Sequence, residues 1–300
     1  MYNGSSLAPR IASGVGVASV QSQTMRRLVN HPNILYNPMT VVRWVRCYER
    51  PSFVLRRRAR NQRTPPITSV LIEISSNCNR KCHFCPNAHH KRSTGFLDED
   101  VVHKVIRELA ELGFKGGVSF NLFNEPLLDK RLLSFLQYTR DILPKAFIYL
   151  NTNGDLLNVE RWKKLRAVGL DFANVSQYDG KLNSNIRQLL SKLSYRERGH
   201  LFAHVFLRDL IQNRAGLVES ERRLKLPVQR FCPRPFYQLC INYEGKVVLC
   251  CNDFFGAVQF GDVRKETVAA IWAGDEIRHY RERLLAADRA SLDLCKSCDI

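Results

Sequence analysis

The chain has 300 residues and a formal net charge of +18 at pH 7, with 45% hydrophobic and 25% charged residues. This composition is ordinary for a globular enzyme and is enough for one large domain with a smaller one beside it. No apolar run reaches the roughly 18 residues that a membrane-spanning helix needs. The first residues lack a compact apolar segment followed by a cleavage site, so we expect a cytoplasmic protein.

The positive charge is concentrated in residues 1–66. This segment holds eleven Lys and Arg residues and one acid, Glu49, and the excess is densest in residues 43–63. Two interpretations remain open: a solvated, partly disordered arm, and an amphipathic segment that contacts an anionic surface or partner. Nucleic-acid binding is not favoured, because no recognisable nucleic-acid-reading module accompanies the charge.

Residues 67–226 alternate between expected strands and expected helices. The strands are predicted at 69–75, 117–123, 146–150, 171–176 and 200–207, and the helices at 98–112, 129–143, 159–168 and 181–193. Such alternation predicts a parallel sheet in an α/β fold. Polar and Gly-containing segments follow the strands, at the end where parallel barrels carry their sites. Only five or six units fit before residue 215, which indicates an incomplete barrel.

The pattern changes over residues 227–300. Residues 238–252 predict two short strands around the turn at Glu244 and Gly245, which is a β-hairpin. A helix is predicted over 267–287, and the chain ends in "CKSCDI". This part is too small for an independent hydrophobic core, so we expect thiolates around a metal to staple it.

Cysteines are numerous and unevenly placed. Without a secretory signal, metal binding is a stronger explanation for them than disulfide bonding. Three lie within residues 78–85, six follow residue 231, and none lies between these groups. We therefore expect two metal sites. The ten positions are Cys47, Cys78, Cys82, Cys85, Cys232, Cys240, Cys250, Cys251, Cys295 and Cys298.

The first cysteine group reads "CNRKCHFCP", a C-x3-C-x2-C spacing on one loop. Zinc sites usually use two pairs of ligands, so a triplet fits zinc poorly. An iron–sulfur cube takes thiolates at its corners, and three thiolates leave one iron open for a substrate or cofactor. The alternative is a zinc knuckle completed by His83, His89 or His90.

"CNRKCHFCP", with the aromatic Phe84 before its third cysteine, resembles the signature of radical S-adenosylmethionine (SAM) enzymes. In that family the three cysteines hold a [4Fe-4S] cluster, and SAM chelates the open iron. Reductive cleavage of SAM then gives a 5′-deoxyadenosyl radical that abstracts a substrate hydrogen. The resemblance implies a partial (β/α)6 TIM-like barrel and a reducing partner such as flavodoxin or ferredoxin. It also implies Cys78, Cys82 and Cys85 as cluster ligands and Phe84 beside SAM.

Three further strings resemble motifs of this family in the expected order. "FNEPLLD" at 123–129 resembles the Gly-Gly-Glu-Pro motif, whose acid binds the SAM ammonium, although an asparagine stands where glycine is usual. "TNG" at 152–154 and "SQYDG" at 176–180 resemble strand-end motifs near the SAM ribose and methionine. The resemblance therefore implies cofactor-binding roles for Asn124, Glu125, Asn151, Asn153 and Ser176.

The second cysteine group resembles the twitch domain of radical SAM enzymes, a short form of the SPASM domain. Cys232 and Cys250 flank the predicted hairpin, and Cys295 and Cys298 form a C-x2-C pair. The resemblance implies that these four hold one auxiliary [4Fe-4S] cluster, with Cys240 and Cys251 left over. A zinc ribbon built from the same four thiols is the alternative.

Between the two groups, "LRDLIQNRAG" at 207–216 resembles a segment that precedes the auxiliary cluster in many such enzymes. Arg214 resembles a substrate-contacting arginine of twitch-bearing aminocyclitol dehydrogenases of the 2-deoxy-scyllo-inosamine type. A guanidinium group suits hydroxyl groups or a developing oxyanion. The alternative is a structural ion pair of Arg214 with Asp209 or Glu219.

The resemblance favours a radical SAM oxidoreductase with a small-molecule substrate. The expected reaction oxidises a secondary alcohol of a polyol, aminocyclitol or sugar, with the auxiliary cluster as electron acceptor. The first alternative is a peptide-modifying radical SAM enzyme similar to RiPP maturases, against which the short, polar arm at 1–66 argues. The second alternative, a non-enzymatic zinc-stabilised binding module, leaves the motifs after the strands unexplained.

Overall fold

The computed structural model of the protein describes residues 62, 64–205, 212–220 and 224–300. The predictions for the basic arm lie almost wholly outside these residues. Among the described helices, none has the length and apolarity needed to cross a membrane.

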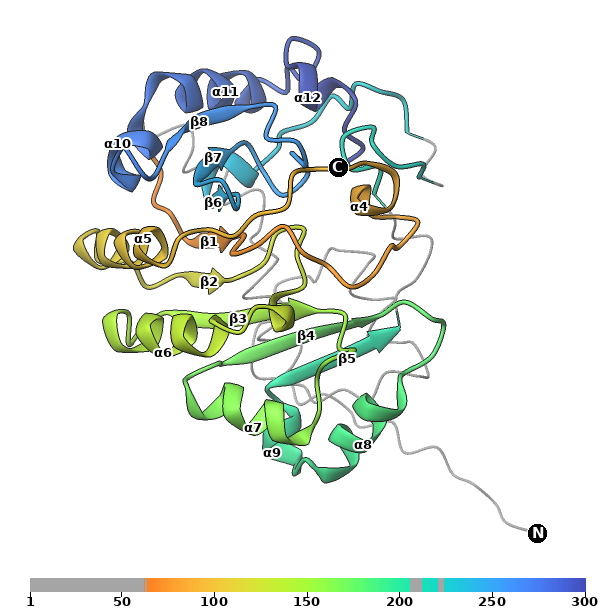
Figure 1. The fold of residues 1–300 in the computed structure, drawn as a ribbon. Coiled ribbons are helices and arrows are strands. Elements are labelled where there is room, and N and C mark those ends of the chain that lie inside the picture. The colour runs from red at the N-terminus through yellow and green to blue at the C-terminus, as the bar shows by residue number, and fades with distance from the viewer. Residues whose placement is uncertain (1–61, 63, 206–211, 221–223) are drawn as a thin grey trace, which may run out of the picture.

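The described residues form one eight-stranded sheet in the order β5-β4-β3-β2-β1-β6-β7-β8 (Figure 1). The first five strands are all parallel to their neighbours, as the alternating pattern predicted. The sheet has two free edges, so the α/β class and its open, incomplete barrel are confirmed. These strands are β1 (Ser69–Ile72), β2 (Gly117–Ser119), β3 (Phe147–Thr152), β4 (Phe172–Gln177) and β5 (Leu201–Val205).

Helices connect these strands and cover the sheet. α5 packs against α6, α6 against α7, and α7 against α8. The four are α5 (Glu99–Glu111), α6 (Leu132–Ile142), α7 (Val159–Ala167) and α8 (Ser184–Lys192). Three single-turn elements between β1 and β5 were not predicted: α4 (Pro86–His89), the 3-10 helix η1 (Pro126–Leu128) and α9 (Tyr195–Arg198).

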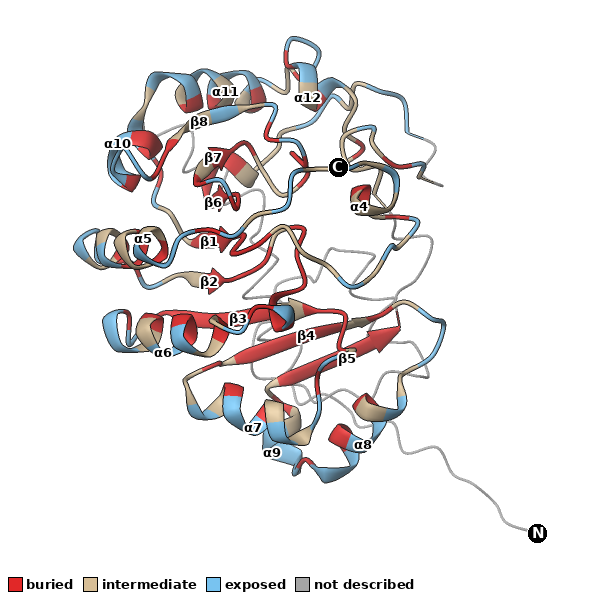
Figure 2. Cartoon of the chain, viewed as in Figure 1, coloured by how far each residue is buried: buried red, intermediate tan, exposed pale blue. Residues whose placement is uncertain are grey.

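Helix α5 shows why these segments fold as they do. Glu99 and Asp100 lie in its first turn, where they complement the positive end of the helix dipole. Val102, Val105, Ile106 and Leu109 are buried, and their spacing places them on one face. This face joins the main core between sheet and helices, in which the inner strands are almost entirely buried (Figure 2).

The C-terminal part extends the same sheet. β6 (Gln238–Ile241) pairs in parallel with β1, and β7 (Lys246–Val248) follows it as the predicted hairpin. A further antiparallel strand, β8 (Gln259–Asp262), was not predicted. The helix expected over 267–287 is divided at Gly274, whose extended backbone separates α10 (Val268–Ala273) from α11 (Asp275–Leu285). The division of the chain at residues 66 and 226 remains a prediction.

A buried ion pair connects β1 to the C-terminal part. The Glu73 side chain is 0% exposed, and the Arg92 side chain, 8% exposed, pairs with it at 2.6 Å. Arg92 also donates to the backbone oxygen of Phe254 and lies over the rings of Phe123 and Tyr243. Burial raises the pKa of Glu73, while Arg92 acts in the opposite direction. The pair therefore joins three segments that are distant in sequence.

Removing one member of this pair should be far more costly than removing both. Arg92→Met leaves a buried, uncompensated carboxylate, so we expect the free energy of unfolding to fall by about 3–5 kcal/mol. The double variant Glu73→Leu/Arg92→Met should recover most of that loss. Lys164→Met, which removes only an exposed pair with Glu160, should leave the urea midpoint unchanged. Equal losses in the single and double variants would contradict this interpretation.

Candidate active site

A cavity of about 740 Å³ lies where β1 to β5 end, between the cysteine loop and the C-terminal part. Figure 1 shows α4 and the C-terminal end of the chain at the edge toward which the arrows of β4 and β5 point. The cavity brings together eleven residues singled out from the sequence. They are Cys78, Cys82, Phe84, Cys85, Asn124, Glu125, Asn151, Asn153, Ser176, Arg214 and Cys232.

The thiols of the cysteine loop are half-buried at the cavity wall. A turn brings the Cys85 backbone N–H to within 2.9 Å of the Cys82 oxygen, and α4 begins directly after it. Burial, together with the neighbouring charges of Cys85 and Cys78, raises the pKa of Cys82 to about 11. Thiolates held this close repel one another unless a cationic centre lies among them. The three side chains therefore suit an iron cluster.

The histidines of the loop do not complete a zinc knuckle. His89 contacts the backbone oxygen of His83, and His90 contacts that of Leu217 at 3.3 Å. None of the three imidazoles lines the cavity. Among the described residues, no three His, Cys, Asp or Glu side chains gather closely enough to hold a single metal ion.

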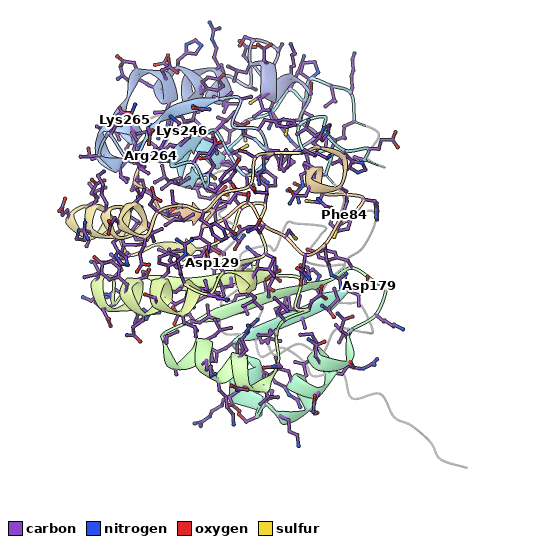
Figure 3. The ribbon with its side chains drawn as sticks, viewed as in Figure 1. Phe84, Asp129, Asp179, Lys246, Arg264 and Lys265 are labelled. Carbon is purple, nitrogen blue, oxygen red and sulfur yellow. The ribbon has the colours of Figure 1, made fainter. Side chains whose placement is uncertain are left out.

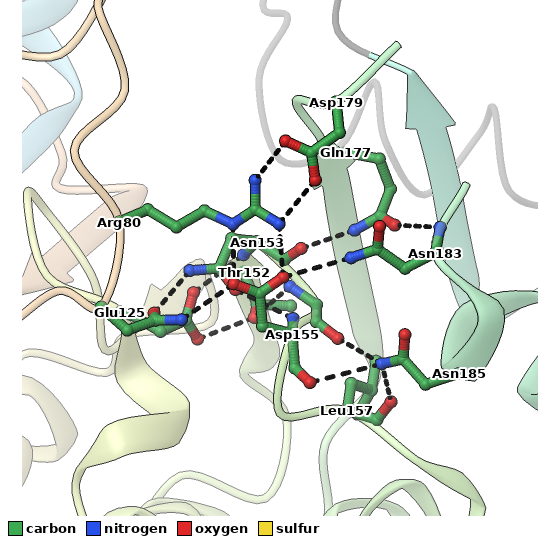
Figure 4. Close-up of polar contacts among 12 residues, drawn as sticks. Arg80, Glu125, Thr152, Asn153, Asp155, Leu157, Gln177, Asp179, Asn183 and Asn185 are labelled. Carbon is green, nitrogen blue, oxygen red and sulfur yellow. Dashed lines mark hydrogen bonds and ion pairs between the residues drawn. The ribbon is translucent and has the colours of Figure 1, made fainter. Parts of the chain in front are cut away.

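Arg80 fixes the cysteine loop to the ends of two strands (Figure 4). Its guanidinium donates to both oxygens of Asp155 at 2.6 Å and to both oxygens of Asp179 at 2.9–3.0 Å. Asp155 follows β3, and Asp179 follows β4. In Figure 3, Asp179 lies at the same edge of the molecule as Phe84. Such bidentate pairs define orientation as well as distance, so Arg80 holds the loop at a set position over the cavity.

Glu125 occupies the centre of a second network beneath the loop (Figure 4). Its carboxylate accepts hydrogen bonds from Thr152 Oγ1 at 2.7 Å and from the backbone N–H groups of Asn153 and Leu127. Burial raises the pKa of Glu125, and these donors lower it. The carboxylate is thereby oriented, as a group that binds the SAM ammonium would need to be.

Backbone conformation and close packing both require glycine at the third position of the "TNG" string. Gly154 has φ +76°, which favours glycine, and an added Cβ would lie 2.6 Å from a methyl group of Val175. Asn153 donates to Asn79 Oδ1 in the cysteine loop at 2.8 Å. The turn therefore places the Asn153 amide where it can bond to the cysteine loop, and so connects that loop to the end of β3.

Two other predicted polar residues, Asn151 and Ser176, form hydrogen bonds with side chains of neighbouring segments. Asn151 accepts from Asn174 and donates to Asn121. Ser176 Oγ lies 3.0 Å from His204 Nε2 on the neighbouring strand. Burial lowers the pKa of His204 to about 4, so this cavity-facing imidazole is neutral at pH 7. By contrast, the Asn124 side chain is used within its own turn, bonding to the backbone of Phe120 and Leu122.

Gln212, Arg214 and the C-terminal part supply the opposite wall of the cavity. Arg214 has φ +50°, and its guanidinium donates to Asn252 Oδ1 at 3.3 Å. Glu219 forms no ion pair with Arg214 within the described residues, and Asp209 lies outside them. Cys251 also lines this wall, and Arg234 donates to its sulfur at 2.7 Å.

A second, small cavity of about 20 Å³ collects the other predicted thiols. Cys232, Cys250, Cys295 and Cys298 all line it, whereas Cys240 and Cys251 do not. Burial, together with the charges of Cys232 and Cys298, raises the pKa of Cys295 to about 12. Apolar side chains of Phe236, Leu249, Leu284 and Leu292 pack around this site. Four thiols in an apolar enclosure suit a fully thiolate-ligated cluster.

Two family models match this chain. The radical SAM superfamily matches residues 72–198, and SPASM, an iron–sulfur cluster-binding domain, matches residues 232–299. The chain therefore contains a radical SAM domain followed by a SPASM domain. These matches confirm the predicted cofactors, which are SAM, its [4Fe-4S] cluster and an auxiliary [4Fe-4S] cluster. The individual ligand assignments remain predictions that the two cavities support.

Among known proteins, the S-adenosyl-L-methionine-dependent 2-deoxy-scyllo-inosamine dehydrogenase of Niallia circulans is 29% identical over 232 residues. This match covers 77% of the present chain and 92% of that enzyme. The crystal structure of BtrN in complex with AdoMet and 2-DOIA has a TM-score of 0.72 at 28% identity, covering 78% of this chain and 93% of that one. The PqqA peptide cyclase of Bradyrhizobium diazoefficiens is 32% identical over 114 residues, 36% of this chain and 28% of that enzyme.

Sequence reasoning missed several side chains that face the main cavity. Arg80 and Tyr178 stand inside strings that were recognised, but their positions within those motifs carry no fixed residue type. His204 lies in an expected strand without any accompanying motif. Arg234 follows Cys232 by two positions, which was the one available signal that it lies near a metal site.

Removal of the Arg80 guanidinium, which holds the cysteine loop through Asp155 and Asp179, should weaken cluster binding. Residues that orient metal ligands typically contribute 10- to 100-fold to metal affinity, so Arg80→Ala should release iron to a chelator at least about tenfold faster. The measurement is the fast phase of iron release from the reconstituted holoenzyme. Arg187→Ala, at an exposed position of α8, is the matched control. Equal release from both variants would show that Arg80 does not hold the cysteine loop.

Proposed function

We propose that this protein is a radical SAM dehydrogenase that oxidises a secondary alcohol of a small polyol, aminocyclitol or sugar. The observation that carries the proposal is the position of the two thiol sets on opposite walls. The main cavity lies between the three-cysteine loop and the four-cysteine site, and Cys232 lines both cavities. The extended match to an aminocyclitol dehydrogenase supports the same reaction class.

The main cavity suits a small substrate together with SAM. Its volume is about 740 Å³, which lies within the range of small-molecule and cofactor sites. Bound SAM and the two clusters would supply the hydrogen-abstracting radical and a site for the electron that remains. The net change in the substrate is the loss of two hydrogens from a carbinol, one as an atom and one as a proton.

The residues of this chain would bind and orient the reactants. Glu125 would hold the SAM ammonium, and Phe84 would pack beside SAM. Asn151, Asn153 and Ser176 would bind its polar groups, as part of a strand-end network that is already hydrogen-bonded. Asn124 would act through the shape of its turn, because its amide is used internally. Arg214, on the opposite wall, would contact substrate oxygen.

Peptide modification is the less favoured function. The match to the peptide cyclase covers only about a third of this chain, whereas the match to the dehydrogenase covers 77%. We further propose a flavodoxin- or ferredoxin-type reductant as the physiological electron source. Contact of the basic arm with an anionic surface stays a prediction from the sequence.

The proposed reaction predicts a defined pair of products. Anaerobic protein reconstituted with about eight irons per chain, reductant and SAM should convert a candidate polyol to a product two hydrogens lighter. 5′-Deoxyadenosine should form in equal amount, with both compounds measured by mass spectrometry. Cys78→Ala should abolish 5′-deoxyadenosine formation while retaining about four irons. Persistent SAM cleavage in this variant, or modification of small peptides in place of polyols, would contradict the proposal.

Substitution of Arg214 tests its proposed contact with substrate. Arg214→Met should lower kcat/KM for the oxidised substrate by about 10- to 100-fold, because a charge-assisted hydrogen bond contributes about 1.5–3 kcal/mol. SAM cleavage without substrate should stay unchanged, since the predicted SAM-binding groups lie on the other wall. Arg214→Lys should restore only part of the loss, because ammonium cannot reproduce the planar fork of guanidinium. If both variants match the wild-type enzyme, Arg214 has no substrate role.

A further inference from the structure

Arg234 lies in the wall between the two cavities. It opens the 3-10 helix η3 (Arg234–Phe236), two residues after Cys232, and it lines both the main cavity and the four-thiol cavity. A guanidinium remains protonated in proteins. A permanent positive charge is therefore present beside the auxiliary site.

The partner of this charge differs from those of the other arginines near the two cavities. Arg80 and Arg92 pair with carboxylates, and Arg289 donates to the backbone oxygens of Arg230 and Ile300. Arg234 has no carboxylate within ion-pair distance among the described residues, and its hydrogen bond goes to Cys251 Sγ at 2.7 Å. An uncompensated cation in an enclosed site is costly, so the surroundings are expected to provide negative charge by another route.

The four-thiol site provides that charge when it holds its cluster. A cube with four thiolates is an anion, and one added electron makes it more negative by one unit. A fixed cation nearby stabilises the more negative form, and reduction potentials of such clusters respond to local charge and hydrogen bonding. The sign is therefore determined: Arg234 favours the reduced cluster.

We propose that Arg234 is the counter-ion of the auxiliary cluster and that its charge raises the reduction potential of that cluster. Arg234 is thus a positioning residue that makes the auxiliary site a better electron acceptor on the side that faces the main cavity. The use of this acceptor in alcohol oxidation rests on the proposed function, whereas the shift in potential does not.

The test is a redox titration of the reconstituted full-length holoenzyme, followed by electron paramagnetic resonance. The auxiliary signal is the one that persists in Cys78→Ala. In Arg234→Met the equilibrium should shift at least tenfold toward the oxidised cluster, which is a fall of about 59 mV for a one-electron couple. Arg234→Lys keeps the charge and should stay within about threefold of the wild-type equilibrium, by the same relation.

The matched control is Arg264→Met. Arg264 lies after β8 in the same part of the chain, and its guanidinium is already compensated by Asp262 at 2.7 Å (Figure 3). Its removal should leave the potential unchanged. A similar shift in the Lys and Met variants of Arg234, or no shift in either, overturns the proposal.

If a neutral variant of Arg234 lacks the auxiliary cluster, its potential cannot be titrated, and iron content becomes the measurement. If Arg234→Met and Arg234→Gln fold but lose the auxiliary cluster while Arg234→Lys retains it, the charge is needed to hold the cluster, which supports the counter-ion role. If the Lys variant loses it as well, charge is insufficient and the proposal fails. A lowered potential in Arg234→Met without any alcohol oxidation by the wild-type enzyme would retain this proposal and remove the proposed function.

Discussion

The ion pairs of Arg80 are the interaction on which the active-site arrangement depends. Between β1 and α5 the chain has little regular structure apart from the single turn of α4, yet it must hold three thiols at a set position. Arg80 holds this segment in place by bonding to Asp155 and Asp179, which follow two different parallel strands. The position of the loop is thereby set by the segments that directly follow β3 and β4.

Three buried or partly buried charges in and beside the active site each have defined partners. Glu73 pairs with an arginine, Glu125 is surrounded by three hydrogen-bond donors, and Arg234 faces thiols. Glu73 and Glu125 are compensated by groups of the protein itself, whereas Arg234 requires an anionic cluster. The auxiliary site is therefore the part whose electrostatics depend most on its cofactor.

Much of the fold and of the site followed from the sequence because the signals were local. The spacing of apolar residues and the residues typical of helix and strand ends predicted the parallel strands and their helices. The cysteine spacings predicted both thiol sets. Long-range pairing could not be predicted this way: nothing local indicates that residues 238–241 join β1. The division of the last long helix arose from Gly274, and the partly buried strand β8 carries only a weak alternating pattern. His204, Arg234 and Cys251 enter the cavities through tertiary packing, outside any motif.

The pairing of β1 with β6 also has a consequence for biosynthesis. One edge of β1 receives its hydrogen-bonding partner from residues 238–241, 169 positions further along the chain. Until that segment leaves the ribosome, β1 presents an unpaired edge next to the loop that carries three thiols. Exposed strand edges promote association between chains. Completion of the sheet and protection of the nascent chain therefore both await synthesis of its last quarter.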